Sequence, residues 1–212
     1  MNAILIGIIV ANVLFSYKGF NDYAFFRKYE FHVGSIRSGE QIRMLSSGFL
    51  HVDFMHLAFN MFTLWCFAPV VSSLLSDFSF VLIYFGSLIF GNLLTMLFHK
   101  NDYSYRAVGA SGAVTGVLYS AILLQPDMTL GIYGIIPIPA YLFGILYLLY
   151  SIYGMKAKND NIGHTAHFGG AIGGYLITLI KDPSLIVDHT LMTILLAIPI
   201  IILFGMAKLG KL

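Results

Sequence analysis

The sequence predicts an all-α, polytopic membrane protein built as one bundle of helices that cross the bilayer. Hydrophobic residues make up 58% of the 212-residue chain and charged residues only 10%, and the mean hydropathy is +0.82. That composition is far from that of a water-soluble domain. Apolar runs of roughly membrane-spanning length also recur along the chain. The expected spans are Ala3–Tyr17, Met55–Leu75, Phe78–Phe98, Ser111–Leu124, Pro139–Met155 and Thr165–Ile180, followed by a seventh at Leu191–Met206.

These runs predict a six-helix core over residues 1–180 and an additional C-terminal helix within residues 181–212, with no separate soluble domain. Ala3–Tyr17 has no Lys or Arg before it and no small-x-small cleavage site, so we expect a retained helix rather than a secretory signal. Because the connection at Ser76–Phe78 is very short, the second and third helices should form an antiparallel hairpin. Pro199 is expected to kink the last run.

The connecting segments differ in character. Lys18–Leu50 mixes aromatic and basic residues, which predicts a loop anchored at the lipid–water boundary, with Arg43 as one of its anchors. His99–Val108 is a polar loop that leads into Ser111. Ile135–Pro139 contains two prolines, so the fifth helix should begin near Pro139, and the apolar residues before it should lie along the membrane face.

The polar residues exclude several classes of membrane protein. Ion-coupled transporters and aspartic intramembrane proteases need carboxylates within the membrane, but every acidic residue here falls in a loop or at the edge of a span. A zinc protease would need a pattern such as His-Glu-x-x-His, which is missing. The net charge of +2 and the lack of a basic stripe argue against a nucleic-acid partner. The lone Cys66 cannot form an internal disulfide and is expected to be a small core residue.

Ser, His and Asn remain inside the bundle, and these residue types suit acyl transfer. A serine hydroxyl becomes a strong nucleophile when a base takes its proton, and neutral imidazole is well matched to that role near pH 7. Backbone N–H groups, Asn and His can stabilise the oxyanion that then develops. Because no carboxylate is expected inside the bundle to orient the histidine, the sequence favours a Ser–His dyad over a triad.

The spacing of these residues predicts which of them meet. His56 and Asn60 are four residues apart, so they project from one face of the second helix. His167 shares a stripe with Gly170 and Gly174, and Ser111 is followed by a second pair of small residues, Gly112 and Gly116. Glycines on facing helices permit close approach in lipid, so the fourth and sixth helices should bring the Ser111 hydroxyl to the His167 ring.

Three motifs in this order resemble those of the rhomboid intramembrane serine proteases: His56-x-x-x-Asn60, Gly109-Ala110-Ser111-Gly112 and Ala166-His167-x-x-Gly170-x-x-x-Gly174. The resemblance covers essentially Ala3–Ile180. It implies Ser111 as nucleophile, His167 as general base, and an oxyanion site made by the Ser111 N–H with His56 and Asn60, beside a loop shaped by Gly109. It also implies substrates that are single-span membrane proteins, a setting of membrane lipid, and no cofactor or metal.

The sequence departs from many rhomboids at Thr115, where an aromatic residue would stack on the catalytic histidine, so the ring must be positioned by something else. The run Leu191–Met206 resembles family members with one added C-terminal helix. His164 is a rival base, and His51 is expected to bond loop backbone. Two other readings stay open: a catalytically silent rhomboid-like protein that binds membrane clients, and a transporter or channel, which the lack of embedded acids disfavours.

Charge and resemblance disagree about orientation. The basic residues of the first loop, with Lys100, Arg106, Lys156 and Lys158, are expected on the face that bears Ser111, which by the positive-inside rule would be cytoplasmic. The resemblance implies instead a plasma membrane location with the site on the extracytoplasmic side. We follow the resemblance, because Lys and Arg anchored at the boundary in a long loop are poor signals of topology.

Overall fold

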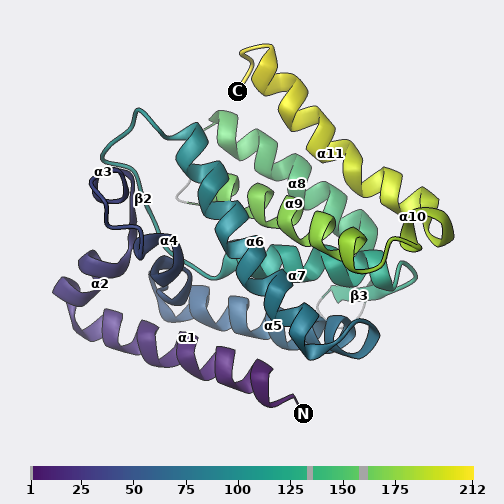
Figure 1. The fold of residues 1–212 in the computed structure, drawn as a ribbon, viewed down its shortest axis with the longest axis horizontal. Coiled ribbons are helices and arrows are strands. Elements are labelled where there is room, and N and C mark those ends of the chain that lie inside the picture. Colours follow the sequence, from purple (N-terminus) through teal and green to yellow (C-terminus); the bar gives the residue numbers. More distant parts are fainter. Residues whose placement is uncertain (1, 133–135, 158–161) are drawn as a thin grey trace.

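The computed structural model describes residues 2–132, 136–157 and 162–212. Ile135, Lys158 and Asp160, which enter the sequence predictions, lie outside these residues. The fold is a bundle of helices, as predicted, joined by short helical turns and two small two-stranded sheets (Figure 1). The long helices are α1 (Ala3–Asn21), α5 (Phe54–Leu74), α6 (Asp77–Phe98), α7 (Ser111–Leu124), α8 (Ala140–Ala157), α9 (His164–Lys181) and α11 (Thr190–Lys208).

Five of these helices are long and apolar enough to cross a membrane, namely α1, α5, α6, α8 and α11. Helix α7 has 14 residues, which at 1.5 Å per residue gives only about 21 Å. Helix α9 carries two histidines and two glycine pairs, which lower its apolar character. Both helices occupy predicted spans, and their positions inside the bundle explain why they can be short or polar.

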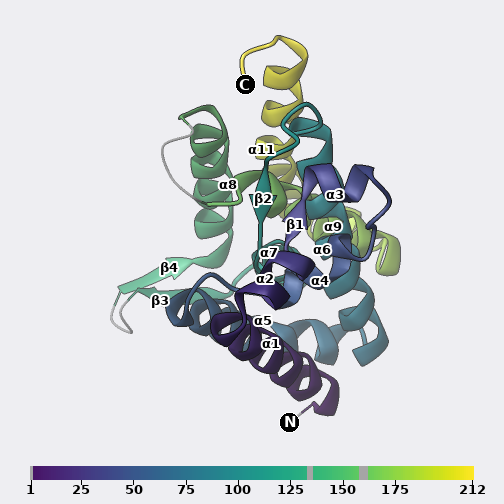
Figure 2. The ribbon, with the colours of Figure 1, turned by 90° about the vertical axis from the view of Figure 1, so that its left-hand side faces the viewer.

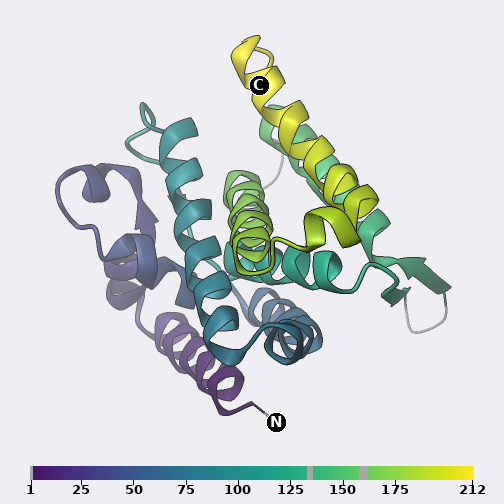
Figure 3. The same ribbon diagram turned by 45° about the vertical axis from the view of Figure 1, so that its right-hand side comes forward.

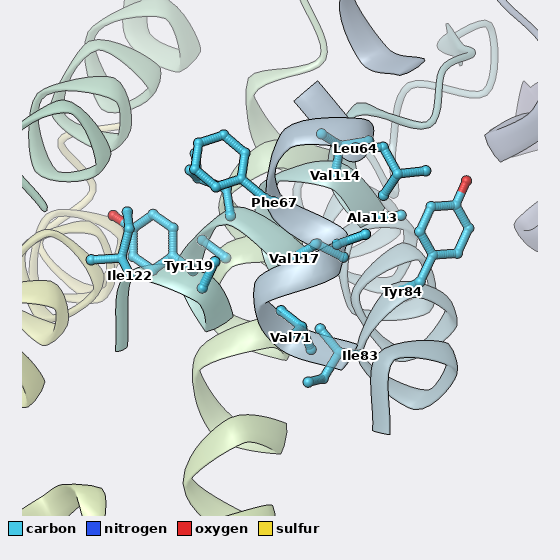
Figure 4. Close-up of a cluster of buried hydrophobic side chains, with 14 of the residues drawn as sticks. Leu64, Phe67, Val71, Ile83, Tyr84, Ala113, Val114, Val117, Tyr119 and Ile122 are labelled. Atoms are coloured by element: carbon cyan, nitrogen blue, oxygen red, sulfur yellow. The ribbon is translucent and has the colours of Figure 1, made fainter. Parts of the chain in front are cut away.

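Helix α7 is the centre of the bundle. Its residues from Gly112 to Leu123 are all buried, because α5, α6, α8, α9 and α11 pack around it (Figure 3). Side chains from α5 and α6 meet those of α7 in one apolar cluster that includes Leu64, Tyr84 and Val117 (Figure 4). A helix covered by protein on every side needs no lipid-facing surface, so its length is set by its neighbours rather than by the bilayer.

Glycines bring α7 and α9 into backbone contact. A Cβ atom added at Gly170 would overlap the carbonyl oxygen of Gly112, and one at Gly174 would overlap that of Gly116. Contact this close is possible only where the α9 face carries glycines, because any side chain would collide with the α7 backbone. Close packing of this kind matters in lipid, where packing rather than the hydrophobic effect associates helices. The glycine contact expected from the sequence is therefore present, and it fixes the spacing between the two helices.

The first loop is folded rather than extended. It contains α2 (Tyr23–Tyr29), β1 (Phe31–His32), α3 (Val33–Arg37), α4 (Arg43–Ser46) and a 3₁₀ turn, η1 (Ser47–Phe49). Strand β1 pairs antiparallel with β2 (Arg106–Ala107), which ties the loop to the segment before α7. Arg43 is buried, and its Nη1 donates hydrogen bonds to the carbonyls of Arg27 and Glu30 at 2.8 and 3.0 Å. It anchors this loop, as expected.

Two local predictions need correction. The segment before α8 forms a β-hairpin, β3 (Thr129–Ile132) with β4 (Ile136–Pro139), that projects from the bundle (Figure 2). A β-ladder satisfies backbone groups that prolines keep out of a helix, and α8 then begins at Ala140, one residue after Pro139. Cys66 is exposed on α5 rather than in the core, because Leu64 and Phe67 occupy the buried face of that turn.

The C-terminal helix packs on the same side of the bundle as α8. A short turn, α10 (Leu185–Asp188), reverses the chain after α9, and α11 then runs along α8 (Figure 1). The Tyr175 hydroxyl on α9 donates a hydrogen bond to the carbonyl of Thr193 at 3.0 Å. Helix α11 continues from Thr190 to Lys208 through Pro199.

Gly170→Ala is expected to destabilise the protein, because the new methyl group meets backbone that no side-chain rotation can move away. Overpacking of this kind typically costs about 1–3 kcal/mol, which should lower the melting temperature in detergent by several degrees. Gly7→Ala is the matched control, since nothing lies within 4 Å of the added Cβ at Gly7 on α1. Equal melting temperatures for both variants would contradict the proposed tight contact.

Candidate active site

The structure brings Ser111 and His167 together. Ser111 is the first residue of α7 and His167 lies in the first turn of α9, so both side chains sit at one end of the α7–α9 contact. The Ser111 Oγ lies 2.7 Å from His167 Nε2, within hydrogen-bond distance. Ser111 is half-buried, and His167 is only 6% exposed. This arrangement allows proton transfer from the hydroxyl to the imidazole.

The other nitrogen of His167 contacts a residue that the sequence analysis did not identify. The Tyr147 hydroxyl on α8 lies 2.8 Å from His167 Nδ1, and the two rings stack with centroids 5.5 Å apart and planes inclined by 29°. A signal was present in the sequence, because Phe143, Tyr147 and Tyr150 recur at helical spacing on the fifth predicted span. All three side chains line the cavity described below.

His164, the rival base, lies elsewhere. Its ring packs edge-on against Tyr150 at 5.3 Å and fills the space beside Gly154, where a Cβ atom would overlap it. It meets the His167 ring edge-on at 6.2 Å between centroids. The α9 histidine within hydrogen-bond distance of Ser111 Oγ is therefore His167.

The predicted oxyanion residues lie beside the serine. Gly109 has φ +130°, a conformation that favours glycine, and a Cβ there would lie 2.8 Å from His56 Cε1. The His56 ring therefore sits directly against the Gly109 backbone. Asn60 is buried one turn later, where its Nδ2 donates to the His56 carbonyl at 2.9 Å. That amide has a second hydrogen, and both side chains line the same cavity as Ser111.

The backbone N–H of Ser111 adds a donor to this group. The first N–H groups of a helix have no acceptor within the helix, and the helix dipole makes this end positive. Thr115, one turn further along α7, donates its hydroxyl to the Ser111 carbonyl at 2.7 Å. Negative charge developing beside Ser111 would thus be stabilised by the start of α7 as well as by side chains.

His51 connects the serine loop to the first helix. The N–H of Ala110 donates to His51 Nε2 at 3.4 Å, and Nδ1 lies 2.8 Å from the Ser16 hydroxyl on α1. The Ser16 hydroxyl donates in turn to the Phe49 carbonyl at 3.0 Å. Burial, with a smaller effect of His56, lowers the pKa of His51 to about 3, so this ring stays neutral. His51 bonds loop backbone, as expected.

One cavity of about 860 Å³ between α5 and α8 is lined by Ser111, His167, His56, Asn60 and Tyr147. Helix α5 contributes His56, Phe59 and Asn60 to its wall, and α8 contributes Phe143, Tyr147 and Tyr150. A cavity between two helices gives room for an extended segment of another chain next to Ser111. Its outer wall is made by loop residues that include Glu30 and Arg106.

In the part of the chain that the structure describes, Glu30 is the one acidic residue of this wall, and it is buried although it lies in a loop. Its carboxylate forms ion pairs with Arg27, at 3.1 Å, and with Arg106. The carboxylate is therefore engaged by arginines of the loops rather than by the histidine dyad. Across the described residues, no three His, Cys, Asp or Glu side chains are grouped closely enough to hold a metal ion.

A family model described as "Rhomboid domain" matches residues 38–183. The chain belongs to the rhomboid family. Its rhomboid relatives include "Putative rhomboid protease YdcA" of Bacillus subtilis, 32% identical over 148 residues, which are 68% of this chain and 69% of that protein. "Rhomboid protease GluP" of the same organism is 31% identical over 143 residues, 66% of this chain and 26% of that protein.

Rhomboid relatives also occur in mitochondria. "RHOMBOID-like protein 12, mitochondrial" of Arabidopsis thaliana is 25% identical over 185 residues, which are 79% of this chain and 55% of that protein. This chain therefore spans about half of the plant relative and about a quarter of GluP. Named proteases among the bacterial relatives support hydrolase activity at the level of the family.

The stability of the fold should depend on pH through His51. Its pKa is about 3 in the folded protein against an ordinary 6.5, so the unfolded state takes up the proton first as the pH falls. His51→Gln removes this titration. The stability advantage of wild type over the variant should therefore be full above about pH 6.5 and shrink towards pH 3, by at most about 1.4 kcal/mol per pH unit.

Thermal denaturation of both proteins in detergent across this range measures the difference. Comparing the two proteins cancels the titration of the carboxylates that they share. A difference in stability that stayed constant from pH 7 to pH 4 would contradict the buried, neutral state of His51.

Proposed function

We propose that this chain is an intramembrane serine endopeptidase that hydrolyses peptide bonds in or near transmembrane helices of other membrane proteins. The observation that carries the proposal is the 2.7 Å approach of Ser111 Oγ to His167 Nε2, two residues from separate helices. Membership of a family that includes named proteases supports the same reaction class. No cofactor is required for this chemistry.

In the proposed reaction, neutral His167 accepts the Ser111 proton at Nε2 as Oγ attacks the scissile carbonyl carbon. The C=O π electrons move to oxygen, which gives a tetrahedral oxyanion. The His167 imidazolium then returns the proton to the departing amine as the C–N bond breaks, leaving an acyl-enzyme. Water, deprotonated by the same imidazole, hydrolyses the ester and regenerates Ser111.

The oxyanion in this scheme is stabilised by the Ser111 N–H with the side chains of His56 and Asn60. A group of fixed donors is effective because it needs no reorganisation when the charge appears. Gly109 keeps the loop in a conformation that leaves space for the His56 ring. We assign Gly109 this shaping role and no chemical step.

Substrate class follows from the position of the cavity. It lies between two apolar helices that are long enough to span a membrane, and it leads to the dyad. A segment unwound from a transmembrane helix would reach Ser111 from the lipid without a passage through bulk water. The catalytic core would comprise residues 1–180, with the additional C-terminal helix in residues 181–212.

The alternative is a catalytically silent rhomboid-like protein that binds membrane clients. The close approach of an intact serine and histidine favours catalysis over this alternative. We also propose a plasma membrane location with the site on the extracytoplasmic side. Labelling of Ser111 in sealed membranes with a membrane-impermeant fluorophosphonate would report the side directly.

Ser111→Ala is expected to abolish cleavage of a reporter transmembrane substrate in liposomes while leaving the melting temperature nearly unchanged, because alanine fills the same space without a nucleophile. A fluorophosphonate probe should label wild type and not His167→Ala, since the serine then lacks its base. Cleavage by Ser111→Ala at the wild-type rate would overturn the proposed function. Equal labelling of wild type and His167→Ala would instead redirect the base role to His164.

Asn60→Ala is expected to lower kcat about 100-fold with little change in KM, because one oxyanion donor is typically worth about 3 kcal/mol. Asn21→Ala is a matched control, since its Nδ2 also donates to the carbonyl four residues earlier, that of Tyr17, far from the cavity. Steady-state cleavage of the reporter measures both variants. Loss of folding in Asn60→Ala, or equal kinetics in the two variants, would show that Asn60 only links turns of its helix.

A further inference from the structure

Tyr147 makes two different contacts with the same histidine. Its ring stacks on the His167 imidazole, and its hydroxyl lies 2.8 Å from Nδ1, the nitrogen on the side away from Ser111. Because Nε2 must accept the Ser111 proton, Nδ1 carries hydrogen in the reactive tautomer and donates to the Tyr147 oxygen. One side chain on α8 therefore contacts both the face of the His167 ring and its Nδ1.

The small side chain of Thr115 explains why the aromatic ring that stacks on His167 comes from α8 rather than from α7. Its side chain is too small to stack on His167, and its hydroxyl donates to the Ser111 carbonyl at 2.7 Å. The Thr115 hydroxyl is thereby engaged within α7, and the ring that stacks on His167 comes from α8 instead.

No other described residue offers both contacts. His164 meets His167 edge-on at 6.2 Å, a geometry that does not fix the plane of the ring from its face. Among the described residues, Glu30 is the only carboxylate on the cavity wall, and arginines of the loops engage it. The role that a buried carboxylate has in a catalytic triad is thus open to a neutral hydroxyl.

We propose that Tyr147 is the positioning residue of His167, and that it makes the reactivity of the base depend on where α8 lies. This inference rests on the Ser–His reaction proposed above. Helix α8 forms the wall of the cavity opposite α5, so a substrate segment that enters between the two helices contacts the helix that carries Tyr147. A shift of α8 that separates Tyr147 from His167 would weaken the base, and a segment that seats α8 correctly would restore it.

The pH dependence of the reaction is a measure of the contact between Tyr147 and His167 Nδ1. Its interpretation must take account of the other titratable groups near His167. A hydrogen bond accepted from Nδ1–H favours the imidazolium more than the neutral ring, so its loss should move the acid limb of the kcat/KM profile to lower pH. Among the described residues, the titratable or charged groups that line the cavity or contact His167 are His56 on α5, Tyr147 and Tyr150 on α8, His164 on α9, and Glu30, Tyr105 and Arg106 in the loops.

Tyr147→Phe keeps the stacked ring and removes the hydroxyl. We expect kcat/KM to fall roughly tenfold and the acid limb to move down by about half a pH unit to one unit. Tyr147→Leu removes both contacts and should lower kcat about 100-fold, because a misplaced base rarely reaches the reactive geometry. Tyr153→Phe is the matched control on the same helix, since Tyr153 is 60% exposed, and it should behave as wild type.

A rescue experiment separates positioning from folding. Thr115→Phe places an aromatic ring one turn after Ser111, on the face of α7 that bears the serine. Alone it should impair cleavage, because Tyr147 already occupies that space. In combination with Tyr147→Leu it should raise kcat at least fivefold above Tyr147→Leu alone, a coupling that a double-mutant cycle measures. Melting temperatures of all variants are recorded alongside the kinetics.

The outcomes distinguish this inference from the proposed function. Wild-type protein that neither cleaves the reporter nor reacts with a fluorophosphonate would overturn the proposed function itself. Active wild type with an unshifted acid limb in Tyr147→Phe, or with no gain from Thr115→Phe in the Tyr147→Leu background, would overturn the positioning role. If the activities of the variants fell only in proportion to their melting temperatures, the role of Tyr147 would be packing, and this too would overturn the positioning role.

Discussion

The backbone contact between α7 and α9 is the constraint on which the rest of the molecule depends. Two helices can approach this closely only where Gly170 and Gly174 face the carbonyls of Gly112 and Gly116. The same approach sets the distance between Ser111 at the start of α7 and His167 in the first turn of α9. Because α7 is covered on all sides, neighbouring helices hold the contact in place. The distance between Ser111 and His167 and the packing of α7 against α9 are therefore set by the same contact.

Much of this could be predicted from the sequence, because the determining signals are local. Apolar runs predict the helices, because a segment that crosses the bilayer must be long and apolar. The predicted start of α7 at Ser111 agrees with the structure to the residue. The spacing of His167, Gly170 and Gly174 along one helix identifies the face that meets α7. The position of a helix end, or of a packing face made of glycines, can be predicted from the sequence when it depends only on residues of that helix.

What was missed depends on contacts between distant segments. Tyr147 gains its significance only because α8 places it over His167, and its neighbours Phe143 and Tyr150 look the same in the sequence. Glu30 is buried because Arg27 and Arg106 surround it, although loop carboxylates are usually solvated. The β3–β4 hairpin could not be predicted, because an apolar run that contains prolines is compatible with several backbone conformations. The pairing of β3 with β4 selects one of these conformations.

The hydrogen bonds around His51 also bear on where the functional unit begins. The family match starts at residue 38, after α1, yet Ser16 on α1 lies 2.8 Å from the His51 ring that accepts the Ala110 amide hydrogen next to Ser111. The first helix is thus part of the support of the loop that carries Ser111, although it lies outside the segment that the family model matches. Besides Ser16, Asn12 on α1 donates a hydrogen bond to the Tyr84 hydroxyl on α6 at 3.1 Å. A chain cut to the matched segment would lose both of these polar contacts, and with them a part of the scaffold behind Ser111.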